Sequence, residues 1–275
     1  MNLSIITVNF NNRAGLQRTI DSLICQTWKE YEWIIIDGGS TDGSLELIEQ
    51  YQHHFTYWCS EPDQGVYHAM NKGVAKANGE YVNFLNSGDI YFDETVLQKI
   101  NDLHSKADII SGKAVRLDNH KPLYEFDGSL FLQLYETTIS HQGAFIKRAL
   151  LNTYPYDESL KIVSDWKFWL QTIIMDHVGV DITDVVVVKQ DMTGISTSQN
   201  SRSKELDQHE RKKVLDVFFP VLLRKELDNY LSIKRSPLAI YGGFLKIENH
   251  TMYTLGWRFL GFLVKLHKIT HRFSK

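Results

Sequence analysis

Short apolar runs alternate with helix-like segments over about the first hundred residues, and this alternation constrains the fold more than any other feature of the chain. Four runs are apolar and of strand length: residues 4–8, 33–36, 56–59 and 81–85. Between the first three runs, apolar residues recur at helical spacing in residues 16–24 and 45–48. A parallel sheet covered by helices produces this pattern. We therefore predict an α/β fold that contains two crossover units.

The rest of the chain differs from this first part in two steps. Residues 106–200 offer further elements, namely β-like runs at 108–111, 144–146 and 185–188 and a Trp- and Phe-rich helix at 165–174. From Ser201 onward, charged helix formers dominate the composition. We expect residues 1–105 and 106–200 to form two halves of one α/β domain, followed by a helical extension over residues 201–275.

Charge and cysteine content argue against several function classes. The 275 residues carry 30 Lys and Arg against 33 Asp and Glu, so no excess of positive charge suggests a nucleic-acid partner. Cys25 and Cys59 lie in no disulfide-rich or metal-binding pattern, which favours a reducing cytosol. We find no export signal and no apolar stretch of about 18 residues. We therefore expect a cytoplasmic protein.

Polar residues follow each of the four apolar runs. They are Asn9 and Asn11, Asp37, Glu61 and Asp63, and the sequence Asn86-Ser87-Gly88-Asp89. Ligands of open parallel sheets bind beyond the carboxyl ends of the strands. One polar residue at such a place is most often a turn residue or a helix cap. Four groups together predict a binding site.

Asp37 and the sequence at 86–89 have the most specific chemistry. A carboxylate at the end of a buried strand can accept the imide N–H of a uracil or thymine ring, and the following glycines let the backbone approach a base. The alternative is that Asp37 caps the next turn. The oxygens at 86–89 suit Mg²⁺ or Mn²⁺ bridging a diphosphate, with phosphates and water completing the shell. The alternative there is a plain turn.

Five short sequence motifs occur in an order and spacing that resemble those of a known family. They are Ser4-Ile5-Ile6-Thr7-Val8-Asn9-Phe10-Asn11, Ile36-Asp37-Gly38-Gly39-Ser40-Thr41-Asp42-Gly43, Asp63-Gln64-Gly65-Val66-Tyr67, Ala69-Met70-Asn71-Lys72-Gly73 and Phe84-Leu85-Asn86-Ser87-Gly88-Asp89. The resemblance covers roughly residues 1–200 and is to the inverting glycosyltransferases of family 2, most of all the branch with colanic-acid-type exopolysaccharide and O-antigen transferases. It implies a GT-A fold. It also implies transfer of a sugar from a nucleotide-diphosphate donor, most often UDP-linked, to a saccharide or lipid-linked saccharide in surface polysaccharide biosynthesis.

The resemblance also implies roles for single residues. The donor-side residues are Thr7, Asn9, Asp37 and Asp63 around the nucleoside, Lys72 near the phosphates, Asn86 against the donor, and Asp89 as the ligand of Mg²⁺ or Mn²⁺. Two positions depart from the family pattern. Asn86-Ser87-Gly88 stands for the usual Asp-x-Asp, and His68 stands where this branch often has Asp. Nucleotide binding is therefore implied more firmly than metal dependence, and the alternative for Lys72 is a solvated helix position.

The second half of the domain is expected to supply the catalytic base and the acceptor contacts. Transfer with inversion needs a carboxylate that removes the proton from the attacking hydroxyl. Asp165 resembles the acidic residue that opens the acceptor-side helix of the family, and its alternative role is that of an N-terminal helix carboxylate. His141, Gln142 and Trp166 are the expected acceptor contacts. Their alternative roles are structural, as for most single histidines and buried tryptophans.

Residues 255–275 have an apolar helical face, a basic face and no acidic residue. This pattern favours an anionic membrane surface as a partner. We expect peripheral association with the cytoplasmic face of the inner membrane. The alternative is that the apolar face packs on the protein's own core or on a second subunit.

Two other function classes compete with a glycosyltransferase. A nucleotidyltransferase would need a Gly-rich, Arg- and Lys-containing triphosphate loop after the first strand, and residues 8–13 lack one. A non-catalytic nucleotide-sugar-binding or scaffold protein of the same fold would account for Asn86 and Gly88. The carboxylates Asp37, Asp89 and Asp165 argue against it. Release of a nucleoside diphosphate from a donor sugar separates the two classes.

Overall fold

The computed structural model describes residues 1–124, 128–193 and 201–235. The chain divides into two compact units, Met1–Phe218 and Phe219–Lys275. The first unit contains a mixed sheet with its helices, and in the second the structure describes helix α9, Val221–Arg235. Within the described residues, no helix combines the length and the apolar character that crossing a membrane requires.

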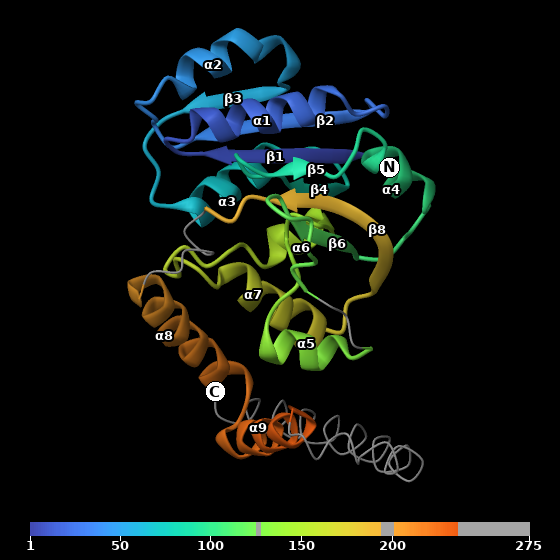
Figure 1. Cartoon of the computed structure of the whole chain (residues 1–275), viewed down its shortest axis with the longest axis vertical. Helices are drawn as coiled ribbons and strands as arrows, with labels where there is room; N and C mark the ends of the chain where they lie inside the picture. The colour runs from blue at the N-terminus through green and yellow to red at the C-terminus, as the bar shows by residue number, and fades with distance from the viewer. Residues whose placement is uncertain (125–127, 194–200, 236–275) are drawn as a thin grey trace. The chain divides into compact units, whose positions relative to one another are not determined.

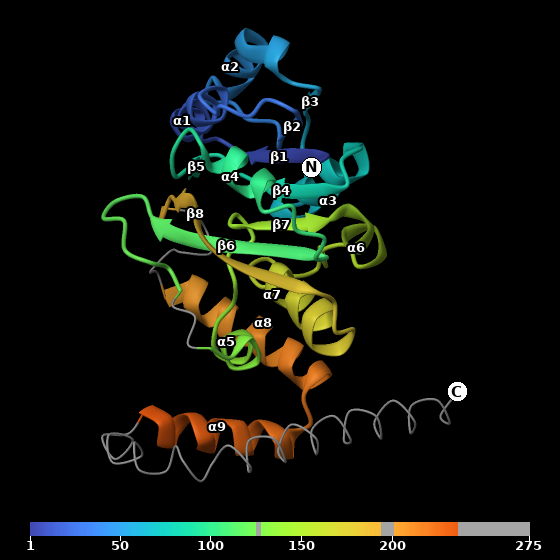
Figure 2. The same cartoon turned by 90° about the vertical axis from the view of Figure 1, so that its right-hand side faces the viewer.

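The sheet of the first unit has eight strands in the order β3-β2-β1-β4-β7-β6-β8-β5 (Figures 1 and 2). Their bounds are β1 Leu3–Asn9, β2 Tyr31–Asp37, β3 Tyr57–Ser60, β4 Tyr81–Phe84, β5 Ile90–Tyr91, β6 Ile109–Arg116, β7 Ala144–Lys147 and β8 Val180–Gln190. β1 pairs in parallel with β2 and β4, and β2 pairs in parallel with β3. β7 runs antiparallel to β4 and β6. Strands β1 to β4 thus form the predicted parallel part of the sheet, while β5, which was not predicted, pairs antiparallel with β8 at the opposite edge.

Helices connect the strands and cover the sheet. They are α1 Arg13–Ile24, α2 Ser44–Tyr51, α3 Val66–Lys76, α4 Val96–Asp102, α5 Leu130–Glu136, α6 Arg148–Thr153, α7 Ser164–Trp169 and α8 Ser201–Phe218. Two short helical turns are η1, Gln52–His54, and η2, Leu170–Met175. The helix predicted over residues 165–174 is thus α7 continued by the π-helical turn η2.

The two faces of the first strand are buried against different helices. Ile5 of β1 belongs to the same core cluster as Leu16 and Ile20 of α1. Because side chains alternate along a strand, Ile6 points to the other face. There α3 lies so close that a Cβ on Gly73 would be 2.4 Å from Cγ2 of Ile6. A residue without a side chain at position 73 therefore allows α3 to pack directly on the sheet.

The boundary of the first unit lies farther along the chain than the composition suggests. Residues 201–275 are expected as one extension, but α8 belongs to the same unit as the sheet. Glu210 of α8 is 4% exposed and hydrogen-bonds the backbone just before α7. In both views α8 lies beside α5 and α7 (Figures 1 and 2). The charged face of α8 hides this contact from a composition-based prediction, because the buried residue is itself acidic.

Candidate functional site

The parallel register brings the ends of β1, β2 and β3 together, so that Asn9, Asp37 and Ser60 are paired across the sheet. Asp37 is fully buried, and its carboxylate accepts hydrogen bonds from Asn9 Nδ2 at 2.7 Å and from the hydroxyls of Ser40 and Ser60, each at 2.6 Å. The backbone N–H groups of Gly39 and Ser40 donate to the same carboxylate. Burial raises the pKa of Asp37, but these hydrogen bonds outweigh it and the pKa lies below its ordinary value.

Asp37 therefore organises the strand-end turn and does not present an open carboxylate. Five donors occupy its oxygens, and the side chain has no exposed surface. The expectation that Asp37 accepts a base N–H directly does not fit this geometry. Thr7 is also fully buried, and its hydroxyl accepts the indole N–H of Trp33 at 3.1 Å, so a nucleoside contact by Thr7 does not fit either. Asn9 lies beside Asp37 at this strand end, and within the described part of the chain its buried Oδ1 has no hydrogen-bond partner.

Phe10 is the aromatic side chain at this strand end, and no role was predicted for it from the sequence. It is 63% exposed although it follows a buried strand. A Cβ on Gly38 would lie 2.7 Å from Oδ2 of Asp63 and 3.1 Å from the Phe10 ring, so these three residues border one narrow space. The signal in the sequence was a single aromatic residue between two polar asparagines at the end of an apolar run.

Lys72 and Asp63 lie on the segments that follow β3. The ammonium group of Lys72, on α3, is 2.5 Å from Glu61 Oε1 in an ion pair, and 22% of the lysine side chain is exposed. Asp63 accepts the backbone N–H of Gly65 at 2.7 Å, just before α3 begins. Lys72 is thus available to a phosphate only in exchange for, or together with, its partner Glu61.

The turn after β4 is held in place by α1. The Thr19 hydroxyl donates to the carbonyl of Asp89 at 2.8 Å and accepts the N–H of Gly88 at 3.0 Å. Asn12 Nδ2 donates to the carbonyl of Ser87 at 3.0 Å. Gly88 has a φ of 107°, which favours glycine over any other residue. The turn therefore has one defined shape.

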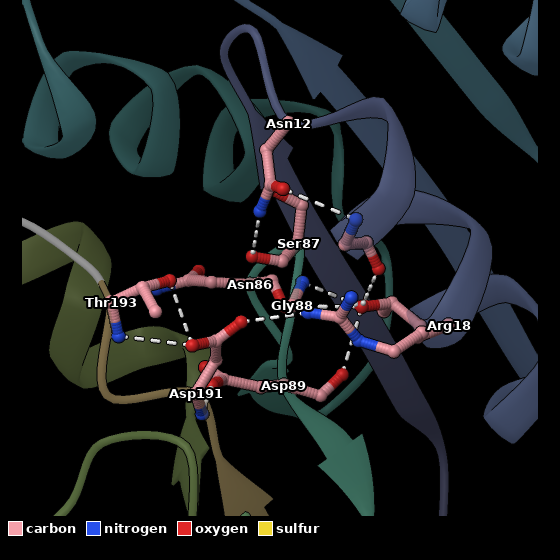
Figure 3. Close-up of polar contacts among 10 residues, drawn as sticks. Asn12, Arg18, Asn86, Ser87, Gly88, Asp89, Asp191 and Thr193 are labelled. Carbon is pink, nitrogen blue, oxygen red and sulfur yellow. Dashed lines mark hydrogen bonds and ion pairs between the residues drawn. The ribbon is translucent and has the colours of Figure 1, made fainter.

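The carboxylate of this turn faces the end of β8. Asp89 is 4% exposed, and it accepts the N–H of Asp191 at 2.8 Å and a hydrogen bond from the Gln142 side chain. Asp191 in turn forms an ion pair with Arg18 at 2.7 Å (Figure 3). Burial raises the pKa of Asp89 to about 7. Neither Arg18 nor Asp191 was predicted, because they meet across 173 positions of the chain.

The residues of this turn fit a divalent cation that shares its shell with a substrate. Among residues 1–124, 128–193 and 201–235, no three His, Cys, Asp or Glu side chains converge on a common point that would enclose an ion. Asn86 nevertheless has a buried Oδ1 with no hydrogen-bond partner, and the Asp89 carboxylate is held by neutral N–H donors. Such oxygens suit Mg²⁺ or Mn²⁺ when phosphates and water supply the other ligands.

Asp165, His141 and Asn86 form a hydrogen-bonded row from α7 to the turn after β4. His141 Nδ1 is 2.9 Å from Asp165 Oδ2, and His141 Nε2 is 3.3 Å from Asn86 Nδ2. The side chains of Asp165 and His141 are 13% and 14% exposed. The Tyr67 hydroxyl lies 2.9 Å from Asp165 Oδ1 and 2.6 Å from the carbonyl of Ile162. The structure thus brings the predicted base next to the predicted donor-side turn.

The protonation states in this row follow from the hydrogen bonds. Burial raises the pKa of Asp165, but the contacts with His141 and Tyr67 outweigh it, so the pKa lies below its ordinary value and Asp165 is ionised at neutral pH. An ionised carboxylate accepts, so Nδ1 of His141 carries its proton. The other ring nitrogen, Nε2, faces the Asn86 side-chain amide at 3.3 Å. Tyr67 lies in one of the five sequence motifs, but no role was predicted for it from the sequence.

Trp166 and Gln142 do not reach an open acceptor surface. Trp166 is 1% exposed, its indole N–H donates to the carbonyl of Leu134, and the Arg211 guanidinium lies 4.4 Å from its ring. The expected acceptor contact by Trp166 therefore does not fit, because α8 and α5 cover the ring. Gln142 is 5% exposed and accepts the Ser140 hydroxyl at 2.8 Å. Gln142 thus supports the turn after β4 through its hydrogen bond to the Asp89 carboxylate.

Comparisons with known proteins agree on one family. Residues 4–153 match the family described as glycosyl transferase family 2. The chain is 33% identical over 182 residues to an uncharacterized glycosyltransferase of Mycobacterium tuberculosis, covering 63% of this chain and 69% of that protein. It is 30% identical over 174 residues to a PGL/p-HBAD biosynthesis glycosyltransferase of Mycobacterium bovis, covering 60% and 67%.

Solved structures share the fold at low sequence identity. Staphylococcus aureus TarS 1–349 in complex with UDP-GlcNAc superimposes with a TM-score of 0.62 and 20% identity, over 91% of this chain and 78% of that chain. The mannosyltransferase PcManGT from Pyrobaculum calidifontis, in complex with GDP-Man and Mn²⁺, gives a TM-score of 0.58 and 17% identity, over 78% and 64%. These likenesses confirm the predicted GT-A-like α/β fold.

Proposed function

We propose a reaction for this chain, which belongs to glycosyltransferase family 2. It transfers a sugar from a nucleotide-diphosphate donor to a saccharide or lipid-linked saccharide, with inversion at the anomeric carbon. The observation that carries the proposal is the row of Asp165, His141 and Asn86. It joins a buried, ionised carboxylate on α7 to the turn at the carboxyl end of β4. A base and a donor site must be neighbours for a hydroxyl to attack the anomeric carbon.

The donor is proposed to bind along the ends of β1, β2 and β4. Phe10 offers an exposed ring for a base to stack on, and the lack of a side chain at Gly38 lets Asp63 and the Phe10 ring lie close to this strand end. Asp37 holds this edge in shape through its five hydrogen bonds. We propose a UDP-linked donor, which is supported by the likeness to the TarS complex with UDP-GlcNAc. Lys72 would turn from Glu61 toward the phosphates.

Asp165 is proposed to remove the proton from the acceptor hydroxyl. As that oxygen forms its bond to the anomeric carbon, the bond from this carbon to the diphosphate breaks on the opposite side, and the proton passes to the carboxylate. His141 and Tyr67 hold the carboxylate ionised and oriented before the transfer. After it, the protonated Asp165 can donate to the Tyr67 oxygen, because the Tyr67 O–H group can donate its own proton to the Ile162 carbonyl at 2.6 Å.

Asn86 and Asp89 would hold a divalent ion, Mg²⁺ or Mn²⁺. When bound, such an ion neutralises charge on the leaving diphosphate. The side-chain Oδ1 of Asn86 has no hydrogen-bond partner among the described residues, and α1 fixes the turn that carries both residues. The PcManGT complex with Mn²⁺ supports this part of the proposal.

A role in surface polysaccharide or glycolipid biosynthesis on the cytoplasmic side is also proposed. The similarity to a PGL/p-HBAD biosynthesis glycosyltransferase supports a biosynthetic role of this kind. The amphipathic residues 255–275 would bring the site to an anionic membrane surface. They lie outside the residues that the structure describes.

The test is UDP release from a panel of UDP-, GDP- and dTDP-sugars, with and without Mn²⁺, using extracted lipid-linked saccharides as acceptors. We expect release from UDP-sugars, and a loss of about 100-fold or more in kcat for Asp165→Asn with donor binding retained. A non-catalytic protein would bind the nucleotide with no release by the wild-type chain. Full activity of Asp165→Asn, or a product that keeps the donor's anomeric configuration, would contradict the mechanism.

A further inference from the structure

Glu210 is a buried carboxylate that the proposed mechanism does not use. It lies on α8, is 4% exposed and accepts three consecutive backbone N–H groups. Oε1 accepts that of Lys161 at 2.8 Å, and Oε2 accepts those of Ile162 at 2.9 Å and Val163 at 3.3 Å. Successive backbone N–H groups that converge in this way form an anion-binding concavity. A side chain 47 positions or more away in the sequence fills it.

The three amides directly precede α7, the helix that carries Asp165. α7 begins at Ser164, and Val163 makes no side-chain capping hydrogen bond to it. A carboxylate near a helix N-terminus is favourable because it compensates the positive end of the helix dipole. Glu210 therefore adds, from another helix, a second acidic group to the one that Asp165 supplies within the first turn of α7. Its position determines where the first turn of α7, and with it Asp165, is held.

A second route connects Glu210 to the same carboxylate through Tyr67. The Ile162 peptide is held on both sides, because its N–H donates to Glu210 and its carbonyl accepts from Tyr67 at 2.6 Å. The same Tyr67 hydroxyl lies 2.9 Å from Asp165 Oδ1. A displacement of the Ile162 peptide would therefore move the partner of Asp165 as well as its helix.

The next residue of α8 supports the other side of Asp165. The Arg211 guanidinium stacks on the Trp166 ring at 4.4 Å and donates to the carbonyl of Thr137 at 3.2 Å. Glu210 thus contacts the backbone before Asp165, and Arg211 covers the ring after it. Thr137 lies on the segment that leads to His141, so α8 contacts the chain near both members of the Asp165–His141 pair.

We propose that Glu210 is a positioning residue for the general base, and that it acts through the Ile162 peptide and the Tyr67 hydroxyl. This inference rests on the proposed function, since it takes Asp165 as the base. It assigns α8 to the catalytic apparatus, although composition alone places this helix in an extension beyond the catalytic domain. Loosening the Ile162 peptide lowers the rate of transfer and leaves the donor site at the ends of β1 and β2 unchanged.

The first experiment compares Glu210→Gln with Glu205→Gln, an exposed position on the same helix. We expect Glu210→Gln to lower kcat for UDP release from UDP-GlcNAc at least about tenfold with KM for the donor within about twofold. Glu205→Gln should match the wild-type chain, and Glu210→Asp should recover part of the loss. Equal kcat in the two glutamine variants would overturn the proposal, as would a loss confined to KM.

The second experiment is a double-mutant cycle of Glu210→Gln with Tyr67→Phe, read in kcat and in the thermal unfolding midpoint. If Glu210 acts through Tyr67, the double variant loses less than the sum of the two single losses. Because both side chains hold the Ile162 peptide, a merely structural role of Glu210 predicts coupling in the unfolding midpoint alone. Additive losses in the logarithm of kcat would refute the proposed route.

A third measurement needs no substrate, so it separates this inference from the proposed function. Hydrogen exchange at the amides of Lys161, Ile162 and Val163 should be faster in Glu210→Gln than in Glu205→Gln, because the acceptor of these amides is weakened. Unchanged exchange would overturn the inference even in an active enzyme. Absence of UDP release by the wild-type chain would contradict the proposed function, while the exchange and unfolding data still decide whether Glu210 holds the peptide.

Discussion

At the scale of single residues, the role of a polar side chain depends on which of its acceptor sites remain free. Asp37 and Asp165 are both buried carboxylates, and hydrogen bonds hold the pKa of each below its ordinary value. Asp37 accepts five hydrogen bonds from its own turn and its neighbours, so it has a structural role. Asp165 is held by two side chains, and its 13% exposed side chain remains within reach of a substrate. The same residue type thus serves two purposes.

Replacing Phe10 by alanine should weaken nucleotide binding. Stacking of a base on an aromatic ring contributes about 1–3 kcal/mol, so we expect the Kd for UDP to rise about tenfold or more. Phe10→Tyr keeps the ring and should bind UDP like the wild-type chain. Isothermal titration of both variants with UDP checks this. Equal affinities of Phe10→Ala and Phe10→Tyr would show that the base binds elsewhere.

Replacing His141 by glutamine should slow the transfer without affecting donor binding. The change removes the Nδ1–H group that lies 2.9 Å from Asp165, so the carboxylate loses orientation and its pKa rises. We expect kcat to fall about 10- to 100-fold with an unchanged Kd for UDP. His209→Gln, at an exposed position of α8, is the matched control. A kcat equal to that of the control would remove His141 from the mechanism.

At the scale of elements, the site depends on contacts between segments that are far apart in the chain. The turn after β4 is fixed by Thr19 of α1 and by Asp191 at the end of β8, which pair with it across 70 and 102 positions. Strands β1 to β4 were predicted close to their observed bounds, since a buried strand leaves a short apolar run in the sequence. Arg18, Asp191 and Glu210 were missed because each acts through a distant partner that no local pattern reveals.

The start of α4 gives a prediction for the dependence of stability on pH. Asp93 accepts hydrogen bonds from the N–H and hydroxyl of Thr95 and forms an ion pair with Lys99 at 2.8 Å. Burial raises its pKa, but these contacts outweigh it and lower the pKa to about 2, against 3.8 for the free group. Because the folded pKa is the lower one, the stabilisation is present above about pH 4 and is lost as the pH falls toward 2.

Asp93→Asn should therefore be less stable than the wild-type chain at pH 7, by about 1 kcal/mol after allowance for the partly exposed position. The difference should shrink between about pH 4 and pH 2. Urea unfolding at pH 7 and at pH 3 measures it. Asp102→Asn, at the other end of α4, is the control. A difference that stays constant over this pH range would contradict the assignment.

At the scale of the whole molecule, the candidate site and the predicted membrane-binding segment belong to different units of the chain. Met1–Phe218 contains every residue of the candidate site, including those that α8 contributes. The predicted membrane-binding residues 255–275 belong to the other unit and lie outside the described residues. Donor binding and membrane binding should therefore be separable by truncation.

A chain that ends before Thr254 should lose binding to anionic liposomes and keep its affinity for UDP. The removed segment carries basic residues and no acidic ones, and each basic residue near an anionic surface contributes about 1 kcal/mol. Flotation with phosphatidylserine-containing and neutral liposomes measures the first property, and titration with UDP the second. Equal flotation of the intact and shortened chains would contradict the membrane proposal.

The sequence by itself determined the sheet, its parallel half and the family. These follow from local patterns, namely apolar runs of strand length and the polar motifs at their ends. Tertiary structure alone decided what those polar residues do. It showed that Asp37 and Thr7 have no free surface, that Trp166 is buried by α5 and α8, and that Asp165 meets His141 across 24 positions. The physical reason is that periodicity records only whether a side chain is buried, whereas its chemistry depends on which distant donors and acceptors the fold brings to it.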